Sequence, residues 1–247
     1  MERFSNDALR CAFDVETNAL IVQDLVENTS HVWFPNIAQL PAWATAAPFR
    51  VPLSWLCNRQ GMQMVHGAGV AIDGRAVLLA GKGGSGKSTT ALACALAGMG
   101  YLGDDYCAVD PEDRTIHMVY RSAKVFPPAV DMLPALNPWI ASQGKLPLEK
   151  DIVFLDAADV NLVRTATLSA ILLPRIGTGP ASTISPATPA EATKAILPTT
   201  FMQLMGGTPV TAALVMQLAR DVPAFHLELG TNLETVTDTI ARLLQSM

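Results

Sequence analysis

MVHGAGVAIDGRAVLLAGKGGSGKS, residues 64–88, is the stretch that decides the fold expected for this chain. It contains two apolar runs, Met64–Ile72 and Arg75–Ala80, on either side of the pair Asp73-Gly74. An Asp-Gly pair between two alternating apolar runs is typical of a β-hairpin with a two-residue type I′ turn. We therefore expect two antiparallel strands that lead directly into the glycine-rich segment.

The register of this hairpin places a histidine beside that segment. Because the turn has two residues, Ile72 lies across from Arg75, and the same register continues along both strands. It brings His66 opposite Gly81, where the glycine-rich segment begins. A histidine in a strand has an ordinary structural role in most cases. Both that role and a catalytic role beside bound phosphates stay open for His66.

The segment GKGGSGKSTT, residues 81–90, matches the phosphate-binding pattern G-x-x-x-x-G-K-[ST]. It follows an apolar strand and opens a helix, which is the setting in which this pattern binds nucleotide phosphates. We expect Lys87 to reach the β- and γ-phosphates of ATP and the Ser88 hydroxyl to bind Mg²⁺. The loop recognises phosphates and not the base, so GTP or pyrophosphate are alternative donors. The expected nucleotide contacts are Gly81, Gly83, Gly84, Ser85, Gly86, Lys87, Ser88 and Thr89.

A second lysine in the loop, Lys82, introduces an alternative. A lysine there is the mark of partition-type ATPases, which change conformation and do not phosphorylate a substrate. Those ATPases normally begin with the loop, whereas about eighty residues precede it here. The strand that follows the loop is also longer in them and ends in a single aspartate. A nucleotide switch is therefore kept as the alternative to a phosphotransferase.

Two adjacent acids follow the expected loop and helix. The helix STTALACALAGMG is followed by a short strand, YLGDDYCAVD, which breaks at Asp104-Asp105. In a βαβ unit the second strand runs parallel to the first, so its end lies on the same side of the sheet as the loop. Paired carboxylates there would serve a metal ion and the acceptor hydroxyl. The alternative is a solvated turn, and the residues do not decide which acid has which task.

Three basic residues are further candidates for contacts to phosphate or to an anionic substrate. Arg121 and Lys124 lie in VYRSAK, and Arg175 follows the apolar run LSAILLP. Ordinary strand-edge residues are the alternative for each of them. The stretch IGTGPASTISPA, residues 176–187, is rich in Gly, Ser, Thr and Pro, and we expect a mobile loop that acts as a lid.

The rest of the chain indicates an α/β protein with two parts. Residues 1–60 form a β-rich layer that ends in a short helix, FRVPLSWLCNRQG. Residues 61–247 form the P-loop domain, with buried strands in DIVFLD and LSAILLPR and a strand in AFHLELG. The segment TPAEATKAIL begins a helix in which Thr188 is the cap, Pro189 the first helical residue and Glu191 the partner of the cap. Two more helices are expected in TPVTAALVMQLARDV and NLETVTDTIARLLQSM.

Composition narrows the class of protein. The chain has 247 residues, 50% of them hydrophobic, and a formal net charge of −5 without a run of Lys or Arg. The charge disfavours a nucleic-acid groove, and no apolar run is long enough to predict a membrane span. The beginning of the sequence shows no apolar signal region. Four widely spaced cysteines fit reduced thiols, and we expect a cytoplasmic protein.

His66–Asp105 resembles the catalytic core of the HPr kinase/phosphorylase family. That family is similar in its His-Gly at the start of a strand, its phosphate loop fifteen residues later and its Asp-Asp pair after the helix. Here His66 precedes Gly81 by fifteen residues and Asp104 follows Ser88 by sixteen. The resemblance implies an HPr-kinase type of P-loop fold. It also implies that Asp104 or Asp105 activates a serine hydroxyl, that Ser88 and one acid bind Mg²⁺, and that His66 lies by the phosphates.

The resemblance covers about forty residues and has limits. The family's second signature, a glycine-rich stretch with a glutamate, has no match, and residues 1–60 have no clear counterpart in its N-terminal domain. The chain looks closer to the family's stand-alone kinase-like relatives, some of which are similar to serine kinases that act on peptides or other small acceptors. We therefore expect a hydroxyl-bearing peptide, protein or small molecule as the acceptor and a homo-oligomer as the assembly. A catalytically degenerate nucleotide-binding scaffold is a further alternative.

Overall fold

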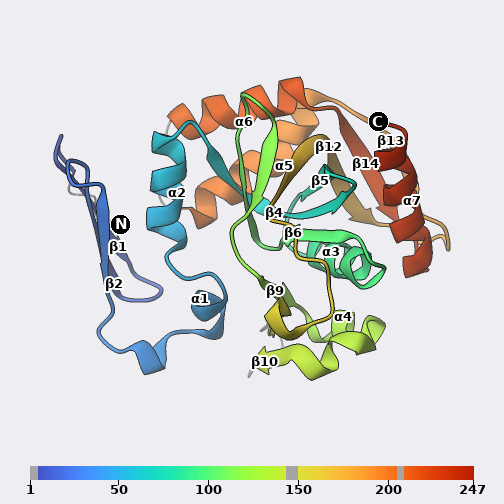
Figure 1. Cartoon of the computed structure of the whole chain (residues 1–247), viewed down its shortest axis with the longest axis horizontal. Helices are drawn as coiled ribbons and strands as arrows, with labels where there is room; N and C mark the ends of the chain where they lie inside the picture. Colours follow the sequence, from blue (N-terminus) through green and yellow to red (C-terminus); the bar gives the residue numbers. More distant parts are fainter. Residues whose placement is uncertain (1–4, 143–149, 205–208) are drawn as a thin grey trace.

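Figure 1 shows the computed structural model of the chain, which describes residues 5–142, 150–204 and 209–247. It is a mixed α/β structure around a central sheet of eight strands, most of whose pairings are antiparallel. The strands of this sheet are β4 (Gln63–Ile72), β5 (Arg75–Ala80), β6 (Gly100–Gly103), β7 (Tyr106–Val109), β8 (Thr115–Met118), β12 (Thr165–Ile176), β13 (Thr183–Ala187) and β14 (Ala224–Leu229).

The hairpin predicted at Asp73-Gly74 is confirmed. Strands β4 and β5 pair antiparallel, and Ile72 lies across from Arg75. The turn residues Asp73 and Gly74 have φ angles of 49° and 78°, as a type I′ turn requires. The strand β4 therefore carries His66 to the edge of the sheet where β5 ends.

The strand after the phosphate loop runs in the predicted direction, but it does not lie next to β5. Strand β6 pairs antiparallel with β4, which itself pairs antiparallel with β5, so β5 and β6 run the same way with β4 between them. Strand β7 continues the pairing with β4 after a break at Asp104-Asp105. The two acids therefore lie at the same edge of the sheet as the end of β5.

The sheet order is β13-β14-β12-β5-β4-β7-β8, and β8 also pairs with the start of β12. The ladder from β12 through β5, β4, β7 and β8 thus returns to β12. Helices cover both faces of the sheet (Figure 1). Successive residues of β5 serve opposite faces: Leu79 packs with α3 and α7, and Leu78 packs with α5 and α6. These helices are α3 (Lys87–Leu96), α5 (Pro189–Gln203), α6 (Pro209–Asp221) and α7 (Leu233–Gln245).

The predicted start of α5 is confirmed in detail. The Glu191 backbone N–H donates to the Thr188 hydroxyl at 3.2 Å, and the Thr188 backbone N–H donates to the Glu191 carboxylate at 2.8 Å. Pro189 is the first helical residue. This capping box satisfies two N–H groups that the first turn would otherwise leave unpaired.

The expectation of a mobile loop over residues 176–187 is wrong for its second half. Residues Thr183–Ala187 form β13, an edge strand that pairs antiparallel with β14. An edge strand tolerates a proline such as Pro186 because one side of it needs no partner. The part before β13 is tied to the end of β14, since the Gly230 N–H donates to the Ser182 hydroxyl at 2.9 Å.

The N-terminal segment is β-rich only in its first half. A three-stranded antiparallel sheet, β1-β2-β3, is followed by helices. Its inner residues Ala12 and Ile21 pack on Val51 and Trp55 of α2, and α2 also contacts β4. The division of the chain at residue 60 stays a prediction. The elements are β1 (Leu9–Asp14), β2 (Ala19–Asp24), β3 (Thr29–Trp33), η1 (Ile37–Gln39), α1 (Ala42–Ala46) and α2 (Arg50–Arg59).

A small sheet with the order β10-β11-β9 completes the structure, and β11 confirms the strand expected in DIVFLD. It lies near α3 and α1 in Figure 1. No helix in the described part of the chain is long and apolar enough to cross a membrane. The elements of this region are β9 (Ser122–Val125), α4 (Pro127–Met132), η2 (Pro134–Trp139), β10 (Ile140–Ser142), β11 (Asp151–Phe154) and η3 (Leu155–Ala157).

Candidate active site

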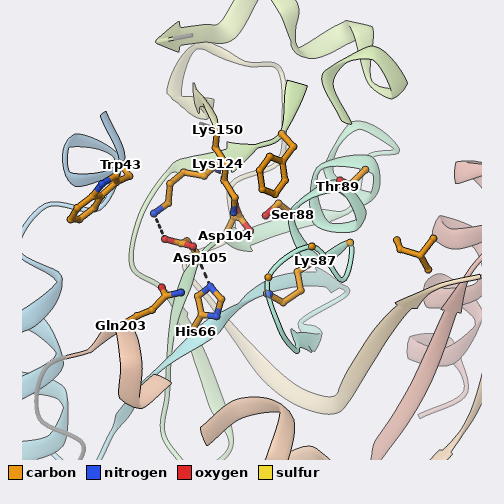
Figure 2. Close-up of a pocket in the computed structure, with 15 residues that line it drawn as sticks. Trp43, His66, Lys87, Ser88, Thr89, Asp104, Asp105, Lys124, Lys150 and Gln203 are labelled. Atoms are coloured by element: carbon orange, nitrogen blue, oxygen red, sulfur yellow. Dashed lines mark hydrogen bonds and ion pairs between the residues drawn. The ribbon is translucent and has the colours of Figure 1, made fainter. Parts of the chain in front are cut away.

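A cavity of about 630 Å³ opens where β5 and β6 end and α3 begins (Figure 2). Most of the residues predicted for the site come together in it. Those that line the cavity are His66, Gly83, Gly84, Gly86, Lys87, Ser88, Thr89, Asp104, Asp105 and Lys124. Gly81 and Ser85 belong to the same loop but are buried behind the cavity wall.

Lys87 is folded back over its own loop. Its ammonium group donates to the backbone oxygens of Gly81 at 2.8 Å and Lys82 at 3.1 Å. Burial lowers the pKa of Lys87, and the nearby charge of Asp104 opposes that shift. A negatively charged oxygen would form a stronger hydrogen bond with this ammonium group than either carbonyl oxygen does. The side chain of Lys82, in contrast, is exposed.

Gly86 is the residue at which the loop turns into α3. It has a φ angle of 99°, a backbone conformation that side chains rarely adopt, and a Cβ atom built on it would overlap Leu229. Strain and overpacking each cost about 1–3 kcal/mol. We therefore expect Gly86→Ala to lower the free energy of unfolding by about 2–4 kcal/mol in urea denaturation.

Gly83 provides the matched control for that measurement. A Cβ atom on Gly83 meets nothing within 4 Å. The Gly83→Ala variant is expected to keep the midpoint of the parent protein within experimental error. An equal loss of stability in both variants would contradict the packing of Gly86 against Leu229.

Asp105 is the centre of a buried charge cluster. One of its oxygens lies 3.3 Å from Nε2 of His66, and the other forms an ion pair with Lys124. Burial alone would raise the pKa of Asp105, but the hydrogen bond from His66 and the charge of Lys124 outweigh burial and hold the pKa well below its ordinary value of 3.8. The carboxylate therefore stabilises the fold above pH values near 3.8, and this contribution is lost as the pH falls towards the folded pKa.

The backbone around Asp105 explains how the cluster is held. Asp105 has a φ angle of 69°, and its backbone oxygen accepts a hydrogen bond from Gly67 N at 3.2 Å. A Cβ atom on Gly67 would lie only 2.8 Å from the Leu79 backbone oxygen, so the position next to His66 requires glycine. The backbone N–H of His66 donates to the Thr200 hydroxyl at 3.2 Å, which links the cluster to α5.

Asp104 has one oxygen engaged and one without a partner. Its Oδ2 accepts from the Lys124 backbone N–H at 3.0 Å. Its Oδ1 is buried and has no hydrogen-bond partner among the described residues. An unpaired buried carboxylate oxygen is costly unless a cation or donor satisfies it. The unpaired Oδ1 of Asp104 and the Ser88 hydroxyl belong to residues that line the same cavity. These two oxygens fit a Mg²⁺ ion, which prefers oxygen ligands and keeps several waters.

Two of the predicted basic residues lie outside the cavity. Arg121 pairs with Asp156 at 2.7 Å, and Arg175 pairs with Glu228 at 3.0 Å. Both guanidinium groups are more than half exposed, and neither residue lines the cavity. The structure therefore does not support the contacts to phosphate or substrate that the sequence suggested for Arg121 and Arg175. Of the three candidates, Lys124 alone lies in the cavity.

Five cavity residues were missed by the sequence analysis. They come from parts of the chain far from the phosphate loop, and no motif marks them. Gln203 accepts a hydrogen bond from the Tyr106 hydroxyl at 2.7 Å, and the Lys150 ammonium lies 5.2 Å from the ring centre of Phe126. Figure 2 shows Trp43 and Gln203 on the Asp105 side of the cavity, opposite Ser88 and Thr89. The missed residues are Trp43, Phe126, Lys150, Ile176 and Gln203.

Comparisons with known proteins show a distant structural relationship. No protein-family model and no curated protein sequence matches the chain. Among solved structures, the chain is similar to the HPr(Ser) kinase/phosphatase from Coxiella burnetii, with 14% sequence identity. The similarity covers 75% of this chain and 92% of that one, with a TM-score of 0.39. The functional conclusion therefore rests on the geometry of the cavity.

The cavity brings together three kinds of chemical group. The phosphate loop offers backbone N–H groups and Lys87 for phosphates. Asp104 and Ser88 offer oxygens for a cation, and Asp105 offers a carboxylate that stays ionised. A cavity of about 630 Å³ lies within the range of about 300–1,000 Å³ that is usual for ligand sites.

Proposed function

We propose that this protein is a kinase that uses ATP and Mg²⁺ and transfers the γ-phosphoryl group to the hydroxyl of a peptide, protein or small-molecule acceptor. The observation that carries the proposal is the buried acid pair facing the phosphate loop. Asp104 keeps one oxygen free for a metal, and Asp105 is held as a carboxylate by His66 and Lys124. Phosphoryl transfer needs these parts, because positioning and charge stabilisation provide most of its catalysis.

The nucleotide would occupy the loop side of the cavity. The loop N–H groups and Lys87 bind its phosphates, and Ser88 and Asp104 would hold Mg²⁺. When bound, the ion neutralises charge on the phosphate oxygens. Lys150 adds a positive charge to the cavity, where its ammonium group lies 5.2 Å from the ring centre of Phe126. That ammonium group stabilises the negative charge on the transferred phosphoryl group.

The acceptor would approach from the Asp105 side. Its hydroxyl oxygen forms a bond to the γ-phosphorus while the bond from that phosphorus to the bridging oxygen of ADP breaks. The hydroxyl proton passes to the Asp105 carboxylate. A carboxylate with a low pKa is a weak base, which suits a loose transition state in which orienting the hydroxyl matters more than removing its proton early.

A nucleotide switch with slow hydrolysis is the second candidate. The observation that favours it is the exposed side chain of Lys82 in the loop, which could reach a second molecule. The two candidates differ in where the phosphate goes, to an acceptor or to water.

The test is transfer from [γ-³²P]ATP with Mg²⁺ in a lysate of the source organism. We expect label in one acceptor, and we expect EDTA to remove that labelling because Asp104 and Ser88 need the metal to hold the phosphates. Slow release of free phosphate without a labelled acceptor would instead support the switch. Label that persists in EDTA would contradict the metal site.

A further inference from the structure

A second cavity lies beside the candidate active site. It has a volume of about 240 Å³ and lies between the N-terminal sheet and the helices α1 and α2. We call it the N-terminal cavity. Its lining is mainly apolar and includes Ile21, Val32, Phe34, Leu40, Trp43 and Phe49, and the charged or polar residues Asp14, Thr17, Thr45 and Arg50 also line it.

Trp43 is shared by both cavities. It lines the active-site cavity on the Asp105 side (Figure 2), and it also lines the N-terminal cavity. The Arg50 guanidinium stacks 4.4 Å from the Trp43 ring centre, and it lies 3.6 Å from Asp14 and 3.5 Å from Glu16. These contacts attach the indole to both α2 and the N-terminal sheet. The indole is thus a fixed wall between the acid pair and the apolar space.

The size and charge of the N-terminal cavity define what it can hold. A cavity of about 150 Å³ takes up one benzene molecule, whereas whole small-molecule ligands use about 300–1,000 Å³. A volume of about 240 Å³ therefore suits one apolar group of a larger molecule. The carboxylates of Asp14 and Glu16 offset the charge of Arg50, whose Nε is buried without a hydrogen-bond partner among the described residues. The offset charge and the mainly apolar lining favour an apolar group over an anion.

The neighbouring strand indicates that this larger molecule is a peptide. Strand β3 is an edge strand that pairs with β2 only, within the part of the chain that the structure describes. Val32 of β3 and the nearby Phe34 line the N-terminal cavity. A free edge binds an extended peptide through main-chain hydrogen bonds, while a pocket beside it selects a side chain.

We propose that the N-terminal cavity binds an apolar side chain of a peptide acceptor whose serine or threonine hydroxyl lies at Asp105. The inference rests on the proposed kinase function and adds a specificity site to it. Trp43 lies between the N-terminal cavity and the acid pair. The apolar side chain in the cavity and the hydroxyl at Asp105 therefore belong to different residues of the same peptide.

The experiment uses alanine-based peptides with one central serine and a leucine moved through each other position. Calorimetry with Mg²⁺ and a non-hydrolysable ATP analogue measures their Kd values, so binding is observed without transfer. We expect one leucine position to lower the Kd about ten-fold relative to the all-alanine peptide. The same position should raise kcat/KM in transfer from [γ-³²P]ATP.

Two variants of the full chain separate the cavity from the rest of the N-terminal sheet. Val32→Phe fills the cavity and should abolish the preference for the leucine position. Val22→Phe adds the same atoms to the opposite face of the sheet, away from the cavity, and should keep the preference. If Val32→Phe only stabilises the fold and the preference persists, the cavity is a packing void and the proposal is overturned.

The possible outcomes also separate this proposal from the kinase function. A leucine preference in binding without any transfer supports the specificity site and contradicts the kinase. Transfer to all the peptides at one rate, with equal Kd values, supports the kinase and overturns the specificity site. Absence of peptide binding overturns the specificity site as well, and the acceptor is then of another class.

Discussion

Replacing Asp105 with asparagine is expected to lower the rate of phosphoryl transfer by about 10²- to 10⁴-fold, the range usual for a group that takes a proton. Asparagine keeps the shape of aspartate, but its single amide oxygen can accept from only one of His66 and Lys124, because an NH2 group replaces the other carboxylate oxygen. It cannot take the proton of the acceptor hydroxyl. The Kd for Mg²⁺·ATP should change little, because the contacts to the phosphates come from the other side of the cavity.

Asp104→Asn is the companion variant, because the two acids differ in their partners. Asp104 has the free buried oxygen, so its replacement should raise the Mg²⁺ concentration needed for half-maximal transfer. Asp105→Asn should leave that concentration as in the parent protein. Parent transfer rates in both variants would rule out the mechanism proposed for the acid pair.

Stability needs a separate check in the Asp105→Asn variant. It leaves the Lys124 ammonium, whose side chain is only 11% exposed, without its counter-charge, and breaking a buried ion pair in this way costs about 3–5 kcal/mol. The double variant Asp105→Asn/Lys124→Met removes both charges and should recover much of the unfolding free energy. The double variant should still fail to transfer phosphate, which would show that the loss of activity does not come from unfolding.

Replacing Lys87 with methionine is expected to weaken nucleotide binding by about two to three orders of magnitude, because truncating a buried charge partner costs about 2–5 kcal/mol. Lys87 is only 7% exposed, and its ammonium group donates to two backbone carbonyl oxygens of the loop in the free protein. Its burial is costly, so the Tm without nucleotide should fall little or rise. The increase in Tm on adding Mg²⁺·ATP should disappear.

Lys82→Met is the matched control in the same loop. Lys82 is exposed and does not line the cavity, so this variant should keep both the Tm shift and the transfer rate. Loss of nucleotide turnover in Lys82→Met, together with a change in oligomeric state on ATP binding, would support the switch. Lys87 and Lys82 thus test the two candidate functions with one pair of variants.

Local sequence patterns predicted the features that depend on local backbone chemistry. The Asp73-Gly74 pair fixes two positive φ angles, and these determine the register that carries His66 to the loop. The capping box at Thr188 and Glu191 involves residues three apart, so it is visible in the sequence. The break in the strand at Asp104-Asp105 was likewise predicted from two adjacent acids in the sequence.

The features that the sequence did not predict depend on contacts between distant segments. Trp43 and Gln203 line the cavity because α1 and α5 approach the sheet there, and neither has a neighbouring motif. Arg121 and Lys124 are three residues apart, yet only Lys124 lies in the cavity. A strand's alternation gives two faces, but only tertiary packing decides which face meets the site. The composition of residues 176–187 predicted a loop, and pairing with β14 made part of it a strand.

Strand β4 has neighbours on both edges, with β5 on one side and β6 and β7 on the other, and nearly all of its residues are buried. Amide protons of such a strand exchange with solvent only when the whole domain unfolds. The N-terminal sheet has its own small core, and its edge amides should exchange earlier. The hydrogen-exchange rates along the chain would then fall in two classes, with the slowest amides directly beneath the phosphate loop and the acid pair.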